Sequence, residues 1–231
     1  MYKYFFKRFL DFWISFIALI CISPVLLVVT VWLHFANKGA GAFFMQARVG
    51  KNGKVFHIYK FKSMTDEKDV DGNMLPDAMR LTKAGRFVRT ASIDELPQLL
   101  NVVKGDMALI GPRPLPFEYY PYYNDREQLR HEVLPGITGW AQVNGRKSVT
   151  WPQKLAYDVE YVEHLCFCLD MKIFWKTVYK VLKKEDVGVE TSGQINFNDV
   201  REAEWRDAGR QDLIDHARAE VQRNRQRVLA G

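Results

Sequence analysis

The feature that most limits the fold of this 231-residue chain is an uncharged, strongly apolar segment near its N-terminus, from Phe12 to Leu33. A helix needs about 20 apolar residues to cross the hydrocarbon core of a bilayer, and this segment is long enough. A cleaved signal peptide is disfavoured, because the apolar run is long and no small-residue cleavage site follows it closely. The sequence therefore predicts one membrane helix and, in the remaining residues, one compact domain.

Both flanks of this segment are basic. The basic residues are Lys3, Lys7 and Arg8 before the segment, and Lys38, Arg48, Lys51 and Lys54 after it. Basic residues mark the cytoplasmic side of a membrane. A simple span would place the two flanks on opposite faces, so this pattern favours both ends of the segment on the cytoplasmic face.

The dipeptide Ser23-Pro24 lies near the middle of the apolar run. Proline inside a helix removes one backbone hydrogen bond and clashes with the carbonyl group four residues earlier, which kinks the helix. The Ser23 hydroxyl can bond to a carbonyl oxygen that the kink releases. These two residues are equally compatible with a re-entrant helix, which returns to the face that it entered, and with a kinked helix that spans the bilayer.

The chain carries a formal net charge of +6, with 48% hydrophobic and 26% charged residues. Such a basic surplus suits nucleic acid, anionic lipid or phosphate-bearing substrates, and composition does not choose among them. The three cysteines, Cys21, Cys166 and Cys168, do not form a disulfide framework, which favours a reducing compartment. No second cluster of ligands accompanies Cys166 and Cys168, so we expect buried free thiols there and no metal.

The rest of the chain predicts an α+β domain that is mostly helical, with a short β-hairpin and amphipathic surface helices. Asn52-Gly53 is a strong hairpin signal within strands over residues 43–61. Further along we expect a surface loop at 65–80, a helix from Ser92 to Gly105, a Gly-rich loop at 135–146, and helices at 152–164 and 171–184. The chain then divides into a membrane helix (1–36), a domain (37–190) and a charged helical tail (191–231) that we expect to be peripheral.

Two adjacent carboxylates, Asp94 and Glu95, open the predicted helix. The run Ser92-Ile-Asp-Glu95 matches a capping box, in which the glutamate bonds back to the cap residue. Pro97 fits the first helical turn better if Asp94 is the cap. In either register the pair lies at the positive end of a helix, where carboxylates stay ionised. An ionised aspartate is a competent nucleophile and a neighbouring glutamate can hold a divalent cation, so a structural and a catalytic role both stay open.

Several basic residues lie on stiff segments or near this carboxylate pair. Arg113 stands between two prolines, so its backbone is nearly fixed, and Arg146 ends a Gly-rich segment. Arginine matches phosphate oxygens with its planar fork, and a fixed backbone lowers the cost of holding it in place. Phosphate ligands beside two carboxylates suggest phosphoryl transfer. The set consists of Lys60, Lys62, Arg86, Arg89, Arg113 and Arg146.

These motifs together resemble the bacterial sugar transferases, and among them the small monotopic phosphoglycosyl transferases of the polyprenyl-phosphate N-acetylhexosamine-1-phosphate transferase type. The resemblance rests on Ser92-Ile-Asp-Glu-Leu-Pro-Gln-Leu-Leu-Asn101, Lys104-Gly-Asp-Met107, Gly111-Pro-Arg-Pro114 and the segment from Pro135 to Arg146. Lys60-Phe-Lys-Ser-Met64 matches the family's Lys-Phe-Arg-Ser-Met with lysine in place of arginine, and Lys7-Arg8, Asp11 and Ser23-Pro24 also match. The resemblance covers residues 1 to about 185 and leaves the tail unassigned.

The resemblance implies a re-entrant membrane helix broken at Ser23-Pro24 and a two-step reaction. Asp94 matches the family's nucleophile, which attacks the β-phosphate of a UDP-sugar and releases UMP, after which undecaprenyl phosphate takes the sugar-phosphate from the aspartyl intermediate. Glu95 matches the family's Mg²⁺ ligand. The residues expected to bind substrate phosphate are Lys60, Arg113 and Arg146, with Arg89 and Asp158 assigned to the same group.

The resemblance also implies a place in the bacterial inner membrane, with the domain facing the cytoplasm, and the first membrane step of glycoconjugate assembly. The expected partners are a UDP-sugar, undecaprenyl phosphate and membrane lipid, with a homodimer left open and no nucleic acid. A non-catalytic scaffold would be favoured by the loss of one carboxylate, and a nucleic-acid binder would need a basic stripe interleaved with exposed aromatics. Among donors, an acetamido sugar is preferred over galactose or glucose.

Overall fold

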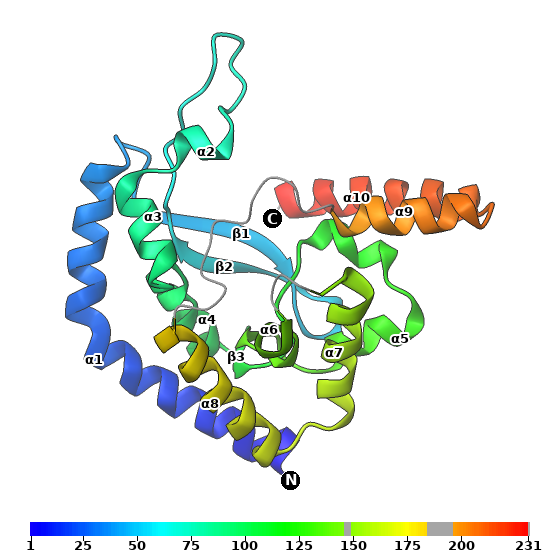
Figure 1. Cartoon of the computed structure of the whole chain (residues 1–231), viewed down its shortest axis with the longest axis horizontal. Helices are drawn as coiled ribbons and strands as arrows, with labels where there is room; N and C mark the ends of the chain where they lie inside the picture. Colours follow the sequence, from blue (N-terminus) through cyan, green and yellow to red (C-terminus); the bar gives the residue numbers. More distant parts are fainter. Residues whose placement is uncertain (146–148, 184–195, 231) are drawn as a thin grey trace.

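The structure, a computed structural model, describes residues 1–145, 149–183 and 196–230. Helices lie on several sides of a two-stranded sheet that runs through the middle of the molecule (Figure 1). The N-terminal elements are η1 (Tyr2–Phe6), α1 (Lys7–Ala36), β1 (Phe43–Val49), η2 (Lys51–Gly53), β2 (Val55–Phe61), α2 (Asp77–Arg80), α3 (Lys83–Thr90), η3 (Ile93–Gln98) and α4 (Leu99–Lys104). The later elements are β3 (Ala108–Ile110), η4 (Phe117–Tyr122), α5 (Asp125–Gln128), η5 (Leu129–Glu132), β4 (Gly136–Thr138), α6 (Trp140–Gly145), α7 (Trp151–Glu163), α8 (Phe167–Lys183), α9 (Phe197–Asp207) and α10 (Gln211–Ala230).

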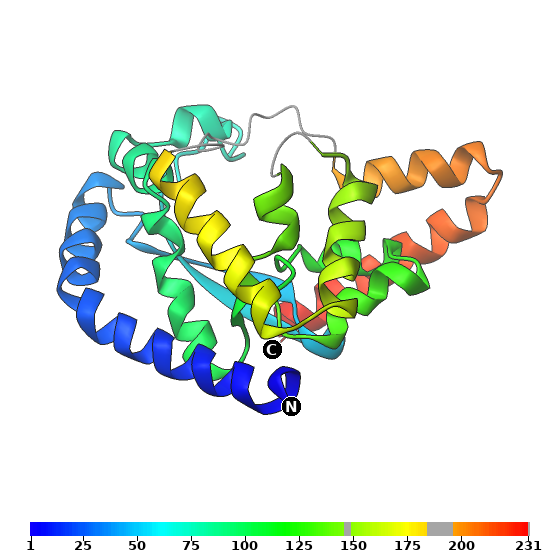
Figure 2. The same ribbon diagram turned by 60° about the horizontal axis from the view of Figure 1, so that its bottom comes forward.

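Helix α1 contains the predicted apolar segment. In the described part of the chain, Tyr2–Ala36 is the one helical stretch that is long and apolar enough to cross a membrane. Pro24 lies inside α1, and the Ser23 hydroxyl donates a hydrogen bond to the carbonyl oxygen of Ile20 at 2.8 Å, as expected for a proline break. The helix changes direction part-way along its length and follows one side of the molecule (Figures 1 and 2).

Both ends of α1 are attached to the domain. At its start, Lys7 forms a buried ion pair with Asp170 of α8 at 2.8 Å, and Arg8 donates hydrogen bonds to two carbonyl groups of α4. Near its end, Leu33 is fully buried in a cluster with Phe61 of β2 and Val88 of α3. The apolar side chains between these two contacts are mostly exposed, so the middle of the helix presents an apolar surface to its surroundings.

The predicted β-hairpin is confirmed. Strands β1 and β2 pair antiparallel, with Phe43 opposite Phe61 and Val49 opposite Val55. Asn52 and Gly53 both take positive φ angles of 55° and 74° in the connection, the conformation that this dipeptide favours. The hairpin is the longer of the two sheets in the described residues.

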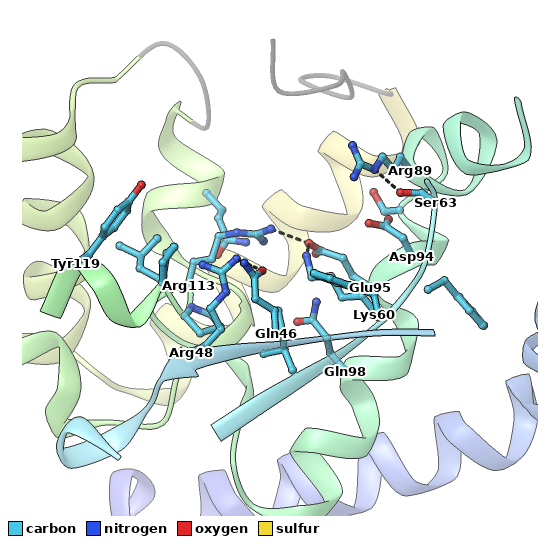
Figure 3. Close-up of a pocket in the computed structure, with 18 of the residues that line it drawn as sticks. Gln46, Arg48, Lys60, Ser63, Arg89, Asp94, Glu95, Gln98, Arg113 and Tyr119 are labelled. Atoms are coloured by element: carbon cyan, nitrogen blue, oxygen red, sulfur yellow. Dashed lines mark hydrogen bonds and ion pairs between the residues drawn. The ribbon is translucent and has the colours of Figure 1, made fainter. Parts of the chain in front are cut away.

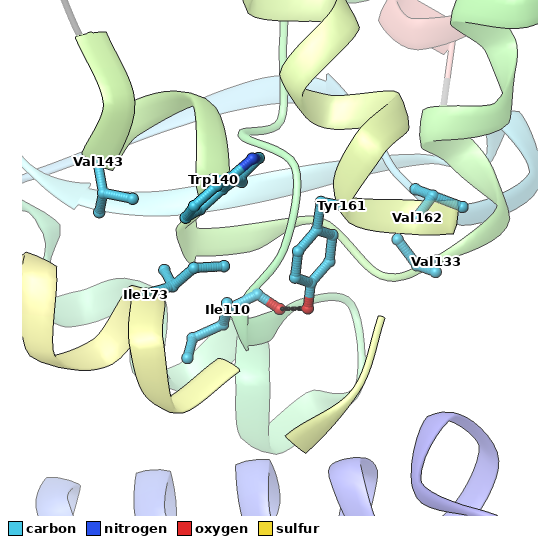
Figure 4. Close-up of a cluster of buried hydrophobic side chains, with 7 residues drawn as sticks. All are labelled: Ile110, Val133, Trp140, Val143, Tyr161, Val162 and Ile173. Carbon is cyan, nitrogen blue, oxygen red and sulfur yellow. Dashed lines mark hydrogen bonds between the residues drawn. The ribbon is translucent and has the colours of Figure 1, made fainter. Parts of the chain in front are cut away.

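The Gly-rich segment was expected to be a loop, and this prediction is wrong. It forms strand β4, which pairs parallel with β3, and helix α6. Trp140 and Val143 of α6 pack with Tyr161 of α7 and Ile173 of α8 in a buried cluster (Figure 4). The Tyr161 hydroxyl donates a hydrogen bond to the Ile110 carbonyl at 3.1 Å, which ties α7 to β3. The segment is therefore part of the core.

Other local predictions are partly right. Helices α7 and α8 occur where expected, and Gly105 ends α4 with a φ of 100°. Cys166 and Cys168 are free thiols, but both are exposed rather than buried. The tail is helical and lies at the edge of the molecule in Figure 1, yet Phe197 and Ile214 are each only 1% exposed. Its helices therefore pack against the domain through apolar side chains, which their sparse apolar pattern did not predict.

Candidate active site

A pocket of about 660 Å³ lies between the β1–β2 hairpin, the η3 turn, the Pro-Arg-Pro segment and helix α7. Seven of the residues singled out in the sequence line it: Lys60, Lys62, Arg89, Asp94, Glu95, Arg113 and Asp158. Arg146 lies outside the described residues, so its predicted place in the site is untested. The structure therefore brings together side chains from segments that are far apart in the sequence.

The two carboxylates lie in the first turn of a 3-10 helix, η3, and not at a capped α-helix. Ser92 has a left-handed φ of 55° and makes no side-chain cap, so the predicted capping box is wrong, and Asp94 is not a cap either. Pro97 lies inside this short turn, and the α-helix begins only at Leu99. Neither predicted capping register therefore occurs. The 3-10 turn places both carboxylates at the pocket.

Asn101 fixes this turn against the sheet. Its side chain is fully buried, accepts a hydrogen bond from the backbone N–H of Tyr59 at 3.1 Å and donates one to the His57 carbonyl at 2.7 Å. At the edge of β2 that has no neighbouring strand, the buried amide of Asn101 bonds to backbone groups that would otherwise be unpaired. Asn101 therefore joins α4, and with it η3, to the free edge of β2, which carries Lys60.

Glu95 is held by two cations. Its Oε1 atom accepts hydrogen bonds from Lys60 Nζ at 2.8 Å and from Arg113 Nη2 at 2.7 Å (Figure 3). Burial on its own would raise the pKa of Glu95, but the charges and hydrogen bonds of Arg113 and Lys60 outweigh it and hold the pKa well below its ordinary value. Glu95 is therefore ionised throughout the physiological range, and it fixes both cations at the pocket wall.

Asp94 has a different environment from its neighbour. Within the part of the chain that the structure describes, its carboxylate makes no hydrogen bond or ion pair, although Lys60, Arg89 and Arg113 are near enough to act on it electrostatically. Burial and the adjacent Glu95 charge raise the pKa of Asp94 above its ordinary value despite these cations. A carboxylate that is not engaged by donors and has a raised pKa is more basic, and so more nucleophilic, than one bound by two cations.

Arg89 reaches the pocket from helix α3. Its Nε atom donates a hydrogen bond to the Ser63 hydroxyl at 2.8 Å, beside Asp94 (Figure 3). The close approach of α3 to Ser63 depends on Gly85, because a Cβ atom there would lie 1.8 Å from the Ser63 carbonyl oxygen. This contact positions a guanidinium group next to the carboxylate pair, as the phosphate-binding prediction requires.

Asp158, predicted to bind phosphate, is engaged in the structure by a buried arginine. It accepts two hydrogen bonds from Arg130, at 3.1 and 2.8 Å, and the two side chains are only 5% and 2% exposed. Arg130 also donates to the carbonyl oxygen of Arg113 at 2.7 Å. A carboxylate repels phosphate. Asp158 instead neutralises the buried Arg130, and Arg130 in turn fixes the backbone of Arg113, the residue expected to bind phosphate. Asp158 therefore belongs to the support of Arg113.

Sequence reasoning missed part of the pocket wall. The pocket residues not singled out include Gln46, Arg48, Gln98, Tyr119, Arg130, Trp151 and Lys154. Arg130 lies in an ordinary charged stretch, and only its pairing with Asp158, 28 residues away, marks it. The position of Arg48 and Gln46 on alternate residues of β1 was a usable signal, since alternate strand residues share a face. The basic side chains of the lining outnumber the acidic ones, which suits an anionic ligand.

The carboxylate pair fits a magnesium ion that is also held by phosphate. No cluster of three or more His, Cys, Asp or Glu side chains occurs among the described residues. Mg²⁺ bound to phosphates needs only one or two protein carboxylates, with water completing its shell. In the described residues Glu95 uses only Oε1 in its two ion pairs, and Asp94 has no donor bound to it. An oxygen ligand is therefore available on Glu95, which would hold the ion beside Asp94.

Known proteins are similar to this chain over most of its length. A family model described as "Bacterial sugar transferase" matches residues 2–184. The "Uncharacterized sugar transferase EpsL" of Bacillus subtilis (strain 168) is 52% identical over 171 residues, which cover 74% of this chain and 85% of the relative.

Two relatives carry a reaction in their names. The "UDP-glucose:undecaprenyl-phosphate glucose-1-phosphate transferase" of Klebsiella pneumoniae is 40% identical over 76% of this chain. The "UDP-N-acetylgalactosamine-undecaprenyl-phosphate N-acetylgalactosaminephosphotransferase" of Aeromonas hydrophila is 38% identical over 77% of it. The matched region makes up 40% and 44% of these two longer relatives.

Proposed function

Because the chain belongs to the bacterial sugar transferase family, we propose that it transfers a sugar-1-phosphate from a UDP-sugar to undecaprenyl phosphate and releases UMP. The reactions named for the Klebsiella and Aeromonas relatives are of this type. The observation that carries the proposal is the pocket in which Asp94 lies, unengaged by donors within the described residues, among cations from three different segments of the chain. In a bacterium this reaction would be the first membrane step of glycoconjugate assembly.

The proposed chemistry has two displacements at one phosphorus atom. An Oδ atom of Asp94 forms a bond to the β-phosphorus of the donor, the bond from this phosphorus to the bridging oxygen breaks, and its electron pair leaves with UMP. An oxygen atom of undecaprenyl phosphate then attacks the same phosphorus, and Asp94 leaves as a carboxylate. The raised pKa of Asp94 supports its role as the nucleophile, and the covalent route lets one pocket serve a soluble donor and a lipid acceptor in turn.

The cations of the pocket meet the electrostatic demand of this reaction. A carboxylate must approach a diphosphate, and two anions repel each other unless fixed positive charge lies between them. Lys60 and Arg113 are held by Glu95 before any substrate binds, and Arg89 is held by Ser63. Donors that are positioned in advance need no reorganisation during the reaction, which is the condition for strong stabilisation of developing charge.

Mg²⁺ is the metal that we propose for this site, with Glu95 as its protein ligand. When bound, the ion would neutralise negative charge on the donor diphosphate. The residues of the chain keep separate tasks. Glu95 fixes Lys60 and Arg113, and Arg113 faces the phosphates from a backbone that Arg130 holds.

For the membrane arrangement we propose a re-entrant helix α1, with both of its ends and the domain on the cytoplasmic face of the inner membrane. The support is that Lys7 and Arg8 at one end of the helix and Leu33 at the other contact the same domain. A straight span would carry one end away from the domain by the thickness of the bilayer, about 30 Å, and would break one of these contacts. A bend in the helix, which Pro24 favours, permits both.

The test of this function is UMP release by the purified protein in detergent with undecaprenyl phosphate, Mg²⁺ and each member of a panel of UDP-sugars. We expect release with one or a few donors, and an acetamido sugar is the one we propose. The Asp94→Asn protein serves as the matched control for contaminating pyrophosphatases and transferases. If no UDP-sugar gave more UMP with the wild-type protein than with this control, the proposed function would be wrong.

A further inference from the structure

The C-terminal hairpin, defined here as helices α9 and α10 (residues 197–230), lies outside the region that the family model matches, residues 2–184. It nevertheless packs against the domain beside η4 and α5 (Figure 1). Phe197, Ile214 and Ala217 are each 1% exposed. The hairpin is therefore an integral part of the fold rather than a free extension.

Polar contacts fix α9 to the segment that carries η4. Glu202 accepts a hydrogen bond from the Tyr122 hydroxyl at 2.8 Å and one from Arg218 of α10 at 2.9 Å. The Trp205 ring stacks on Tyr122 with ring centroids 5.6 Å apart. Because Glu202 is bonded to both η4 and α10, it joins the two helices of the hairpin to the same point of the domain.

Phe197, the first residue of α9, connects this anchor to the pocket. Its ring lies 5.6 Å from the ring of Tyr119, 5.3 Å from Tyr123 and 5.7 Å from Trp151. Tyr119 and Trp151 line the pocket, as does Asn196, the residue that precedes Phe197. Two aromatic side chains of the wall are thus packed against a residue of the hairpin, and contacts of this kind restrict ring position.

The aromatic wall and the nucleophile are at opposite ends of the pocket. Figure 3 shows Tyr119 at one end and Asp94 with Arg89 at the other, with Arg113 between them. In an in-line displacement at phosphorus, the leaving oxygen departs on the side opposite the attacking oxygen. A donor whose β-phosphate lies at Asp94 therefore extends its nucleotide away from Asp94, toward the aromatic end.

The chemistry of this end suits a nucleoside monophosphate. Tyr119 and Trp151 offer aromatic surface on which a base can stack. Stacking of this kind does not depend on which base is bound, because every base has a π-face. Lys154, which also lines the pocket, places its ammonium group 4.6 Å from the centre of the Trp151 ring, where it can meet a phosphate. Aromatic surface and a cation side by side are what a uridine phosphate requires.

We infer that the C-terminal hairpin holds the wall of the subsite for the leaving nucleotide, with Phe197 as the positioning residue for Tyr119 and Trp151. The inference rests on the proposed function, since it takes the ligand to be the UMP part of the donor. Phe197 does not touch substrate itself. Its contribution is to keep the two aromatic side chains where a uracil base contacts them.

The test is the steady-state kinetics of full-length Phe197→Ala. We expect the KM for the UDP-sugar and the inhibition constant of UMP to rise together by about tenfold, the loss typical of one base–aromatic contact. The kcat and the KM for undecaprenyl phosphate should stay within about twofold of wild type. Phe197→Leu keeps an apolar side chain in the same place and should show the same split with a smaller factor, which gives a second variant if Phe197→Ala does not fold.

The matched control is Ile214→Ala, which removes apolar volume from the same hairpin but does not line the pocket. It should lower thermal stability without changing the UMP inhibition constant. In the double variant Phe197→Ala/Trp151→Ala, the rise in that constant should be smaller than the product of the two single effects, because both act through one contact.

Two results would overturn the inference. One is a fall in kcat with unchanged constants for donor and UMP, as expected if the hairpin only stabilises the fold. The other is an equal rise in the constants for donor and acceptor. Failure of the proposed function is recognised separately, because then the wild-type protein would release no UMP in the same assay.

Discussion

Neutralising Asp158 should destabilise the protein more than any change in a surface ion pair. In Asp158→Asn the Arg130 guanidinium, which is 2% exposed, stays buried without its counter-ion. Breaking one partner of a buried pair typically costs about 3–5 kcal/mol of unfolding free energy. At about 2–4 °C per kcal/mol for a chain of this size, the melting temperature should fall by about 6–20 °C.

The assay is thermal and urea unfolding of the purified protein in detergent, followed by tryptophan fluorescence. A matched control is Glu163→Gln, which removes one charge from an exposed pair with Arg126 whose side chains are 76% and 42% exposed. That change should alter stability by no more than about 1 kcal/mol. The double variant Arg130→Met/Asp158→Leu should recover much of the loss, because well-packed apolar residues often replace a buried pair without penalty.

The reasoning would be refuted if Asp158→Asn were as stable as the Glu163→Gln control. It would also fail if the double variant were less stable than Asp158→Asn, since this would show that the charge of Arg130 is not the source of the penalty. A folded Asp158→Asn protein should show weaker donor binding, because Arg130 holds the backbone of Arg113 at 2.7 Å.

Three further predictions concern Asp94 and helix α1. Asp94→Asn should abolish UMP release, yet the variant should unfold at the same or a higher temperature than the wild type. The pKa of Asp94 is raised in the folded protein, so folding penalises its ionised form and the stability of the wild type falls as pH rises through this pKa. Loss of the fold in the variant would contradict this. The rate of UMP release should increase with pH on the acid side, with an apparent pKa above the ordinary value of 3.8, as the nucleophile ionises; a profile that is flat down to pH 4 would exclude Asp94 ionisation as the cause. Pro24→Ala should shift α1 toward a straight span. A cysteine placed at position 3 should then be labelled from outside the cell, whereas the same cysteine in the wild-type background should stay protected. Equal protection in both would show that the proline does not set the topology.

The elements that the sequence predicted well are those set by local chemistry. The uncharged run before Leu33 and the Asn52-Gly53 turn each have one physical solution, a membrane-length helix and a hairpin. Ser92 to Pro97 allowed two capping registers, of which Pro97 favoured the one with Asp94 as the cap. The structure has neither: a 3-10 turn forms instead, next to Asn101, which bonds to β2. A pattern of caps alone could not show this.

The remaining differences come from contacts between distant segments. Gly136 reads as a loop signal, but a Cβ atom there would lie 2.1 Å from the backbone nitrogen of Gly111, so this glycine permits close packing of β4 against the β3 segment. Asp158 reads as one charge on a helix until Arg130 is placed beside it. Phe197 is a single aromatic residue in a polar stretch, and only the fold shows that it contacts the pocket wall.

The most direct measurement of the covalent mechanism is a single-turnover experiment with donor and Mg²⁺ in the absence of undecaprenyl phosphate. We predict a burst of UMP equal to the amount of active enzyme, with radiolabel from the sugar retained on the protein at Asp94 and discharged when the lipid is added. Label at another residue, or no UMP and no labelled protein until undecaprenyl phosphate is present, would contradict the account, because the sugar-phosphate would then not pass through Asp94.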